Sequence, residues 1–165
     1  MKETRKYDSG VLQNLLNDLK VNLRIVDDSQ DRGLAQSLTA ALASAGRIIG
    51  QEILPVEITA VFASEGSDTI RLAAPLIRSV SVMSDGVDIT DRCSLSGRSL
   101  TVEAESGSTV TVTYSSGMVP IPPDIEAAVL LIAGSMHNNP LDGVRTLQKA
   151  SDCLLRPHRS WGHGD

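Results

Sequence analysis

The spacing of apolar residues changes twice along this chain of 165 residues, and this change constrains the possible folds more than any other feature. Apolar residues recur at helical spacing up to about residue 49, alternate with polar residues from Pro55 to about Tyr114, and return to helical spacing after residue 124. A helix turns once in about 3.6 residues, whereas a strand points successive side chains to opposite faces. The pattern predicts an α+β fold, a helical bundle of about four helices with an inserted antiparallel β-meander.

Two helices are predicted before the strands, over about 11–20 and 30–49. The second helix carries one continuous apolar stripe, and several of its other residues are small. Small side chains allow a neighbouring helix or a neighbouring subunit to approach closely. We therefore expect a subunit-packing surface on this helix, formed by Ala35, Ala40, Ala43, Ser44 and Arg47.

The acidic segment 27–31 lies between these two helices. Asp27, Asp28 or Ser29 could each be the N-cap of the second helix, and Asp27 with Gln30 has the spacing of a capping box. A cation site is the alternative, but the segment lacks the glycine and the distal glutamate of a calcium loop. Helix capping is therefore the favoured interpretation.

Short strands are predicted within residues 56–115. The clearest is Thr109–Tyr114, in which apolar side chains alternate with threonines and share one face. Asp85-Gly86 is a strong hairpin turn, and Ser96-Gly97 and Ser106-Gly107 are weaker turn signals. Together these features predict an antiparallel meander with one buried face and one solvated face.

Two further helices are predicted after the strands, over about 124–137 and 142–155. The first follows a proline-rich connector and is apolar all round, so it should be buried between its neighbours. We expect residues 1–155 to form a single domain. Residues 156–165 have no hydrophobic pattern, so we expect a flexible C-terminal tail there.

Composition argues against several classes of function. Aromatic residues make up 2% of the chain, which predicts an aliphatic core and argues against stacking platforms for bases or sugars. The net charge is −5 and no basic stripe is present, so a sequence-specific reader of duplex DNA is not expected. We expect no signal peptide and no membrane span, and reduced, unpaired thiols at Cys93 and Cys153 in a cytosolic protein.

The sequence contains no recognisable catalytic grouping. His137, His158 and His163 lie near predicted helix ends or in the tail, and none has a nucleophile and an orienting acid beside it. Phosphate-binding loops, dinucleotide fingerprints and metal-ligand spacings are also missing from the sequence. We therefore expect a protein that is not an enzyme, with no catalytic residues, no metal and no cofactor.

The C-terminal tail combines two arginines with the only tryptophan of the chain. Arg156, Arg159 and Trp161 follow directly on the last predicted helix. Tryptophan and arginine are frequent anchors of protein interfaces. The sequence leaves two interpretations open, a partner-binding segment and an ordinary frayed end.

Two pieces of the sequence stand out by their order and spacing. The first helix leads into Leu-Lys-Val-Asn-Leu-Arg-Ile, residues 19–25, and then into Asp27-Asp28. The last strand, Val-Thr-Val-Thr-Tyr-Ser-Ser-Gly, residues 110–117, leads through several prolines to Ile125, and the last helix closes in Leu-Leu-Arg-Pro-His-Arg, residues 154–159. This layout, over about residues 11–159, resembles the head–tail connector (adaptor) family of long-tailed phages and related gene transfer agents.

The resemblance implies a structural virion protein of the neck, made in the host cytoplasm. Copies would form a ring, usually of about twelve, beneath the portal protein, and the ring would extend the DNA channel. It would join the capsid vertex to a head-closure or tail-completion protein, and DNA would pass through without sequence-specific contact. The resemblance also implies portal contacts near the C-terminus, at Leu154, Leu155, Arg156, His158, Arg159 and Trp161.

Two other functions remain open from the sequence. Another phage neck protein, such as a head-closure or tail-completion subunit, would be richer in strands and poorer in helices. A small non-catalytic protein-binding module would stay monomeric even in the presence of portal protein.

Overall fold

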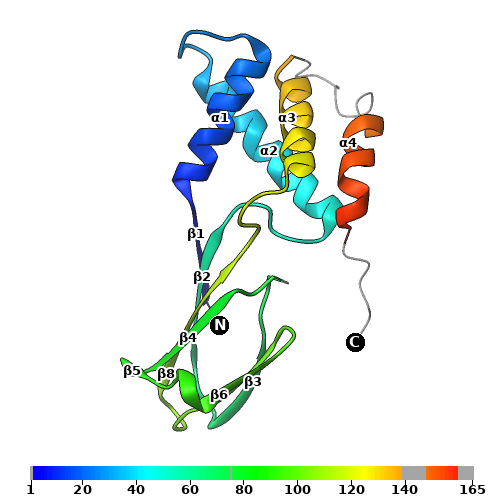
Figure 1. Cartoon of the computed structure of the whole chain (residues 1–165). Helices are drawn as coiled ribbons and strands as arrows, with labels where there is room; N and C mark the ends of the chain where they lie inside the picture. The colour runs from blue at the N-terminus through cyan, green and yellow to red at the C-terminus, as the bar shows by residue number, and fades with distance from the viewer. Residues whose placement is uncertain (1, 75, 139–147, 160–165) are drawn as a thin grey trace. The chain divides into compact units, whose positions relative to one another are not determined.

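The computed structural model in Figure 1 describes residues 2–74, 76–138 and 148–159, without the side chains of residues 148 and 149. The chain forms two compact units. A β unit consists of Met1–Tyr7 and Pro55–Gly117, and a helical unit consists of Asp8–Leu54 and Met118–Asp165. The predicted α+β class is confirmed, because antiparallel strands are inserted between two pairs of helices.

The described part of the helical unit contains four α-helices and one short 3-10 turn. These are α1 (Ser9–Leu23), α2 (Asp31–Ile49), α3 (Pro123–Asn138), α4 (Gln148–Leu155) and the turn η3 (Arg156–His158). Helix α3 contacts the other three helices and is therefore the central helix of the unit (Figure 1). The predicted start of the last helix, residues 142–147, lies outside the described residues. Within the described ranges, every helix is too short or too polar to span a membrane.

The core of the helical unit is aliphatic, as the scarcity of aromatic residues predicts. The predicted stripe of α2 faces this core, with Leu34 and Leu38 fully buried, and Ile125 of α3 is also fully buried. Each such side chain stabilises the fold by about 1.5–3 kcal/mol relative to its exposed state. The prediction that α3 is buried on all sides is wrong. Leu131 is 44% exposed, because the described helices cover only part of the surface of α3.

Helix α1 begins earlier and ends later than the sequence pattern predicts. Asp8 is its N-cap, and the Asp8 Oδ1 accepts hydrogen bonds from the backbone N–H groups of Gly10 and Val11, at 2.8 and 3.3 Å. Such a side chain satisfies donors that the first turn of a helix leaves unpaired. The helix ends at Leu23, and its C-cap, Arg24, adopts the left-handed conformation with φ 57.

The β unit contains two antiparallel sheets. The larger sheet has the order β1-β2-β8-β4-β5, with β1 (Lys2–Tyr7), β2 (Val56–Ala63), β8 (Thr109–Ser116), β4 (Ser79–Ser84) and β5 (Val87–Asp88). The smaller sheet has the order β3-β7-β6, with β3 (Ser67–Arg71), β7 (Ser99–Glu103) and β6 (Cys93–Ser96). A 3-10 turn, η1 (Thr90–Arg92), connects β5 to β6.

The strand order is more complex than a meander. The first and last strands of the inserted segment, β2 and β8, pair along their whole length, from Val56 opposite Ser116 to Ala63 opposite Thr109. Both strands are long and alternate apolar with polar residues, so each offers the other a full ladder of hydrogen bonds and one apolar face. The inserted segment therefore ends beside the point where it begins.

The alternation predicted for Thr109–Tyr114 is confirmed, because Val110, Val112 and Tyr114 are all buried. The hydroxyl of Tyr114 accepts a hydrogen bond from the N–H of Ala73 at 3.2 Å. The predicted hairpin turn at Asp85-Gly86 joins β4 to β5, and both residues have positive φ, 48 and 84. Positive φ at both central residues is the geometry that Asp-Gly favours in tight hairpins.

Candidate assembly surfaces

The two leucines predicted to contact a portal protein belong to the core of the helical unit. Leu155 is fully buried, and Leu154 is partly buried against the same core. Their burial follows from the amphipathic pattern of α4, in which Ser151 is also buried while Ala150 and Cys153 are exposed. A partner that docks on this surface meets the outer face of α4 rather than Leu155.

Polar contacts fix the segment that follows α4. His158 Nε2 lies 2.5 Å from Asp124 Oδ2 at the start of α3, and the His158 carbonyl accepts a hydrogen bond from Gln51 Nε2 at 3.2 Å. Arg159 Nη2 lies 3.5 Å from Asp152 Oδ1 on α4. The sequence pattern predicts a tail for residues 156–159, whereas they form η3 and its C-terminal cap on the helical unit.

Arg156 is the exposed member of this group, and His158 and Arg159 are half-buried. Trp161 lies outside the described residues. The structure therefore brings together Arg156, His158 and Arg159 on one short segment, held by contacts to α3 and α4.

The contact between His158 and Asp124 makes the attachment of η3 dependent on pH. The hydrogen bond from His158 lowers the pKa of the Asp124 carboxyl, and the N–H of Ile125 lowers it further. A carboxyl with a lowered pKa stabilises the fold above its unfolded-state pKa, and this contribution is lost as the pH falls through the folded-state pKa. The stabilising contribution is therefore present at neutral pH and disappears in acid.

Asp124→Asn is expected to lower the thermal unfolding midpoint of the protein at about pH 6, and this difference should fade as the pH falls from about 4 through the lowered pKa of Asp124. Asp18→Asn, at an exposed position of α1, is the matched control and should change the midpoint little at either pH. Calorimetric scans of the three proteins across this range provide the measurement. An Asp124→Asn difference that stays constant with pH would show that the carboxylate does not stabilise the fold through its charge.

The small-residue surface predicted on α2 is only partly exposed. Ala40, Ala43 and Arg47 are exposed and share one face of the helix, because they are three and four residues apart. Ser44 is half-buried, and Ala35 packs against the core of the helical unit. The surface available to a neighbouring subunit is therefore centred on Ala40, Ala43 and Arg47.

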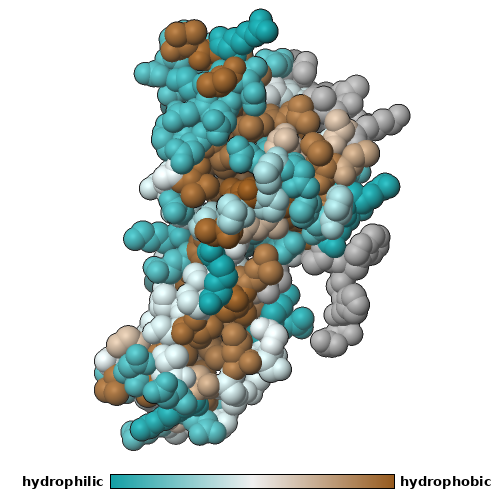
Figure 2. Space-filling view, in the orientation of Figure 1, coloured by the Kyte–Doolittle hydropathy of each residue, from teal (hydrophilic) through white to brown (hydrophobic). Residues whose placement is uncertain are grey.

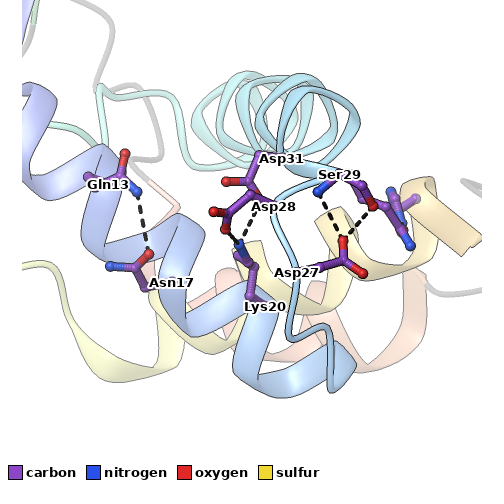
Figure 3. Close-up of polar contacts among 9 residues, drawn as sticks. Gln13, Asn17, Lys20, Asp27, Asp28, Ser29 and Asp31 are labelled. Carbon is purple, nitrogen blue, oxygen red and sulfur yellow. Dashed lines mark hydrogen bonds and ion pairs between the residues drawn. The ribbon is translucent and has the colours of Figure 1, made fainter.

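The acidic segment before α2 does not cap that helix in the predicted way (Figure 3). Lys20 Nζ lies 2.6 Å from Asp28 Oδ1 and 2.7 Å from Asp31 Oδ1, and these carboxylates raise the pKa of Lys20, Asp28 most strongly. Asp27 accepts hydrogen bonds from the N–H and the hydroxyl of Ser29. The N-cap residue is Gln30, whose side chain makes no capping hydrogen bond.

The capping prediction is therefore wrong, because both candidate aspartates are engaged elsewhere in the turn. Asp28 binds Lys20 of α1, and Asp27 closes a local turn with Ser29. Among the described residues, no three His, Cys, Asp or Glu side chains are placed to hold a metal ion. The acidic segment ties the end of α1 to the beginning of α2.

Two apolar side chains stand out at the same end of the helical unit. Val21 is 74% exposed and Val26 is 97% exposed. Figure 2 shows that apolar residues also reach the surface elsewhere, on the visible face of both units. Single exposed apolar residues are common on soluble proteins, so these two valines alone do not define an interface.

Strand β1, at one edge of the larger sheet, is a surface that no pattern in the sequence predicts. All six of its side chains are exposed, and Lys2, Arg5 and Lys6 make it mainly basic. Strand β5 lies at the opposite edge of the same sheet, in a region with three aspartates: Asp85, Asp88 and Asp91. Hydrogen bonds from Thr90 lower the pKa of Asp88, so this carboxyl stays ionised at neutral pH.

Known proteins resemble this chain in fold rather than in sequence. No protein-family model and no curated protein matches this chain. A chain in the neck of an empty gene transfer agent (GTA) particle, computed with C6 symmetry, is 16% identical with a TM-score of 0.68, over 96% of this chain and 95% of that chain. A chain in the virion of a native GTA particle is 16% identical with a TM-score of 0.66, over the same shares of the two chains, 96% and 95%.

A chain in the neck of a native GTA particle, computed with C12 symmetry, is 15% identical with a TM-score of 0.65, over 94% of each chain. At this identity the likeness defines the fold. The protein has the fold of a chain found in the neck of GTA particles, which is the fold expected from the resemblance to phage head–tail connectors.

Proposed function

We propose that this protein is a structural subunit of the neck of a phage or gene transfer agent. Copies of it form an adaptor ring beneath the portal, extend the DNA channel and join the capsid vertex to the next neck or tail component. The observation that carries this proposal is the likeness to GTA neck chains over nearly the whole length of both chains. The symmetries with which those necks were computed, C6 and C12, support a ring.

The surfaces of the helical unit support the same role. Arg156 is exposed at the end of α4, on a segment that the contacts of His158 with Asp124 and of Arg159 with Asp152 hold in place, so its guanidinium is accessible to a partner. Ala40 and Ala43 allow close approach of another subunit along α2. The four described helices favour an adaptor over the strand-rich neck proteins. The role is structural, and no step of it requires catalysis.

The portal contact is tested with the portal protein encoded by the same genome. Arg156→Ala, Arg159→Ala and Trp161→Ala combined are expected to weaken binding of this chain to portal rings by about tenfold or more, because buried arginine and tryptophan anchors dominate such interfaces. Arg71→Ala, which removes an exposed arginine of β3, is the matched control and should bind as the unmodified chain does. Binding is measured by interferometry on immobilised portal rings.

Equal binding by the triple variant and the control would show that the C-terminal segment does not contribute to portal binding. The unmodified chain could instead bind a head-closure or tail-completion protein and fail to bind portal rings. That result would show that the protein is another neck component and not the adaptor.

A further inference from the structure

The larger sheet of the β unit is open, and its two edges differ in charge. Strand β1 at one edge carries three basic side chains and one acidic one. Glu3 Oε2 lies 4.0 Å from Arg5 Nη2, and Glu57 of β2 lies opposite Lys6, so these two acids offset part of the positive charge. Lys2 lies opposite Val61 and has no acid across from it on β2. The β4–β5 turn, β5 and η1 at the other edge carry three aspartates and one arginine.

Both edges also offer backbone groups for pairing. Strand β1 pairs with β2 along one side only, so its outer side presents alternate N–H and C=O groups. At the other edge, β5 pairs only with Met83 and Ser84 of β4. Residues 79–81 of β4 pair with β8 on one side, and the described part of the chain has no strand on their other side.

The strand directions fit a continuation of the sheet. Neighbours β1, β2, β8 and β4 are antiparallel in turn, so β1 and β4 run in opposite directions. A second copy in the same orientation therefore presents its β1 antiparallel to the free part of β4. Through the registers of the sheet, Lys2 of that β1 lies level with Met83, at the β5 end of the edge and near its aspartates. Lys6 lies level with Ser79, at the other end of β4.

We propose that copies of this chain associate edge to edge, with β1 of one copy pairing with the β4–β5 edge of the next. This inference rests on the proposed ring function and names the contact that builds the ring. The contact is heterologous, the type that closes into a ring when the rotation between copies permits. Charged side chains on β1 oppose indiscriminate strand pairing, and opposite charge on the receiving edge selects this partner.

Charge reversal tests the pairing. Lys2→Glu is expected to weaken self-association about fivefold at low salt, since an attractive charge at the β5 end of the edge becomes repulsive. Adding Asp91→Lys, at an exposed position of η1, should restore part of the loss. Sedimentation velocity measures association of the chain alone and in the presence of the portal protein of the same genome, and circular dichroism verifies that each variant is folded.

A disulfide provides a second readout. Thr4→Cys and Ser81→Cys are introduced together in a chain carrying Cys93→Ser and Cys153→Ser. Within one chain β1 and β4 are three strand spacings apart, about 14 Å, which is too far for a disulfide. Oxidation should therefore give a ladder of linked copies. The control combines Thr4→Cys with Ser94→Cys on β6 and should give none.

The outcomes separate this inference from the proposed function. Rings or portal-bound oligomers that neither the charge reversal nor the cysteine pair affects would overturn the edge pairing and leave the ring function standing. A chain that stays monomeric both alone and with portal protein would overturn both. A cross-linked ladder together with charge-dependent association would support the pairing of β1 with the β4–β5 edge.

Discussion

Tyr114→Ala is expected to destabilise the β unit by about 3–5 kcal/mol. Tyr114 is 1% exposed and is the largest fully buried side chain of the protein's described residues. It lies on β8, which pairs with both β2 and β4, so the cavity would open at the centre of the larger sheet. With so few aromatic residues, the chain has little else of that size to fill the space.

Tyr114→Phe separates the ring from the hydroxyl. This variant keeps the packing but removes the acceptor of the part-buried N–H of Ala73, which should cost about 1 kcal/mol. Urea denaturation gives the free energies, and hydrogen exchange of β8 amides assigns the loss to the β unit. If Tyr114→Ala costs no more than Tyr114→Phe, the aromatic ring does not fill the core in the way described.

Leu155→Ala is expected to destabilise the helical unit by about 2–5 kcal/mol, because Leu155 is the fully buried residue by which α4 enters the core. Leu154→Ala is the matched control in the same helix and should cost less, since Leu154 is only partly buried. The measurement is urea denaturation of the isolated protein. This measurement distinguishes a core role of Leu155 from a portal-contact role. If Leu155 only contacted a portal protein, Leu155→Ala would leave the free energy of unfolding of the isolated chain unchanged.

Hydrophobic spacing predicted most of the fold. The stripe of α2 and the alternation of β8 both depend on local periodicity, and both face a core as predicted. The turn at Asp85-Gly86 was also predictable, because few dipeptides accept two successive positive φ values. These features are encoded within a few residues and need no knowledge of distant partners.

Strand β1 could not be predicted in this way. Its sequence, Lys-Glu-Thr-Arg-Lys-Tyr, has no alternation of apolar and polar residues, and all of its side chains are exposed. It is a strand because β2 offers a free edge for pairing from Lys2 opposite Val61 to Tyr7 opposite Val56. The pairing of β2 with β8 and the resulting strand order are likewise set by contacts between distant parts of the chain.

Contacts between distant parts of the chain also explain why only part of the candidate surfaces could be predicted. Ala40, Ala43 and Arg47 are exposed on α2, the helix on which the sequence places them, whereas Arg156 was expected in the tail and lies in η3. The attachment of His158 to Asp124 joins residues far apart in the chain, and no local pattern reveals it. Asp27 and Asp28 had the composition of a helix cap, but Ser29 and Lys20 engage their carboxylates instead.

The most direct test of the proposed role is electron cryo-microscopy of particles produced by the genome that encodes this chain. We expect a ring of copies of this fold in the neck, between the portal and the next tail component, with the end of α4 facing the portal. Neck density that is complete without this fold, or density for the fold at another position in the particle, would contradict the proposed function.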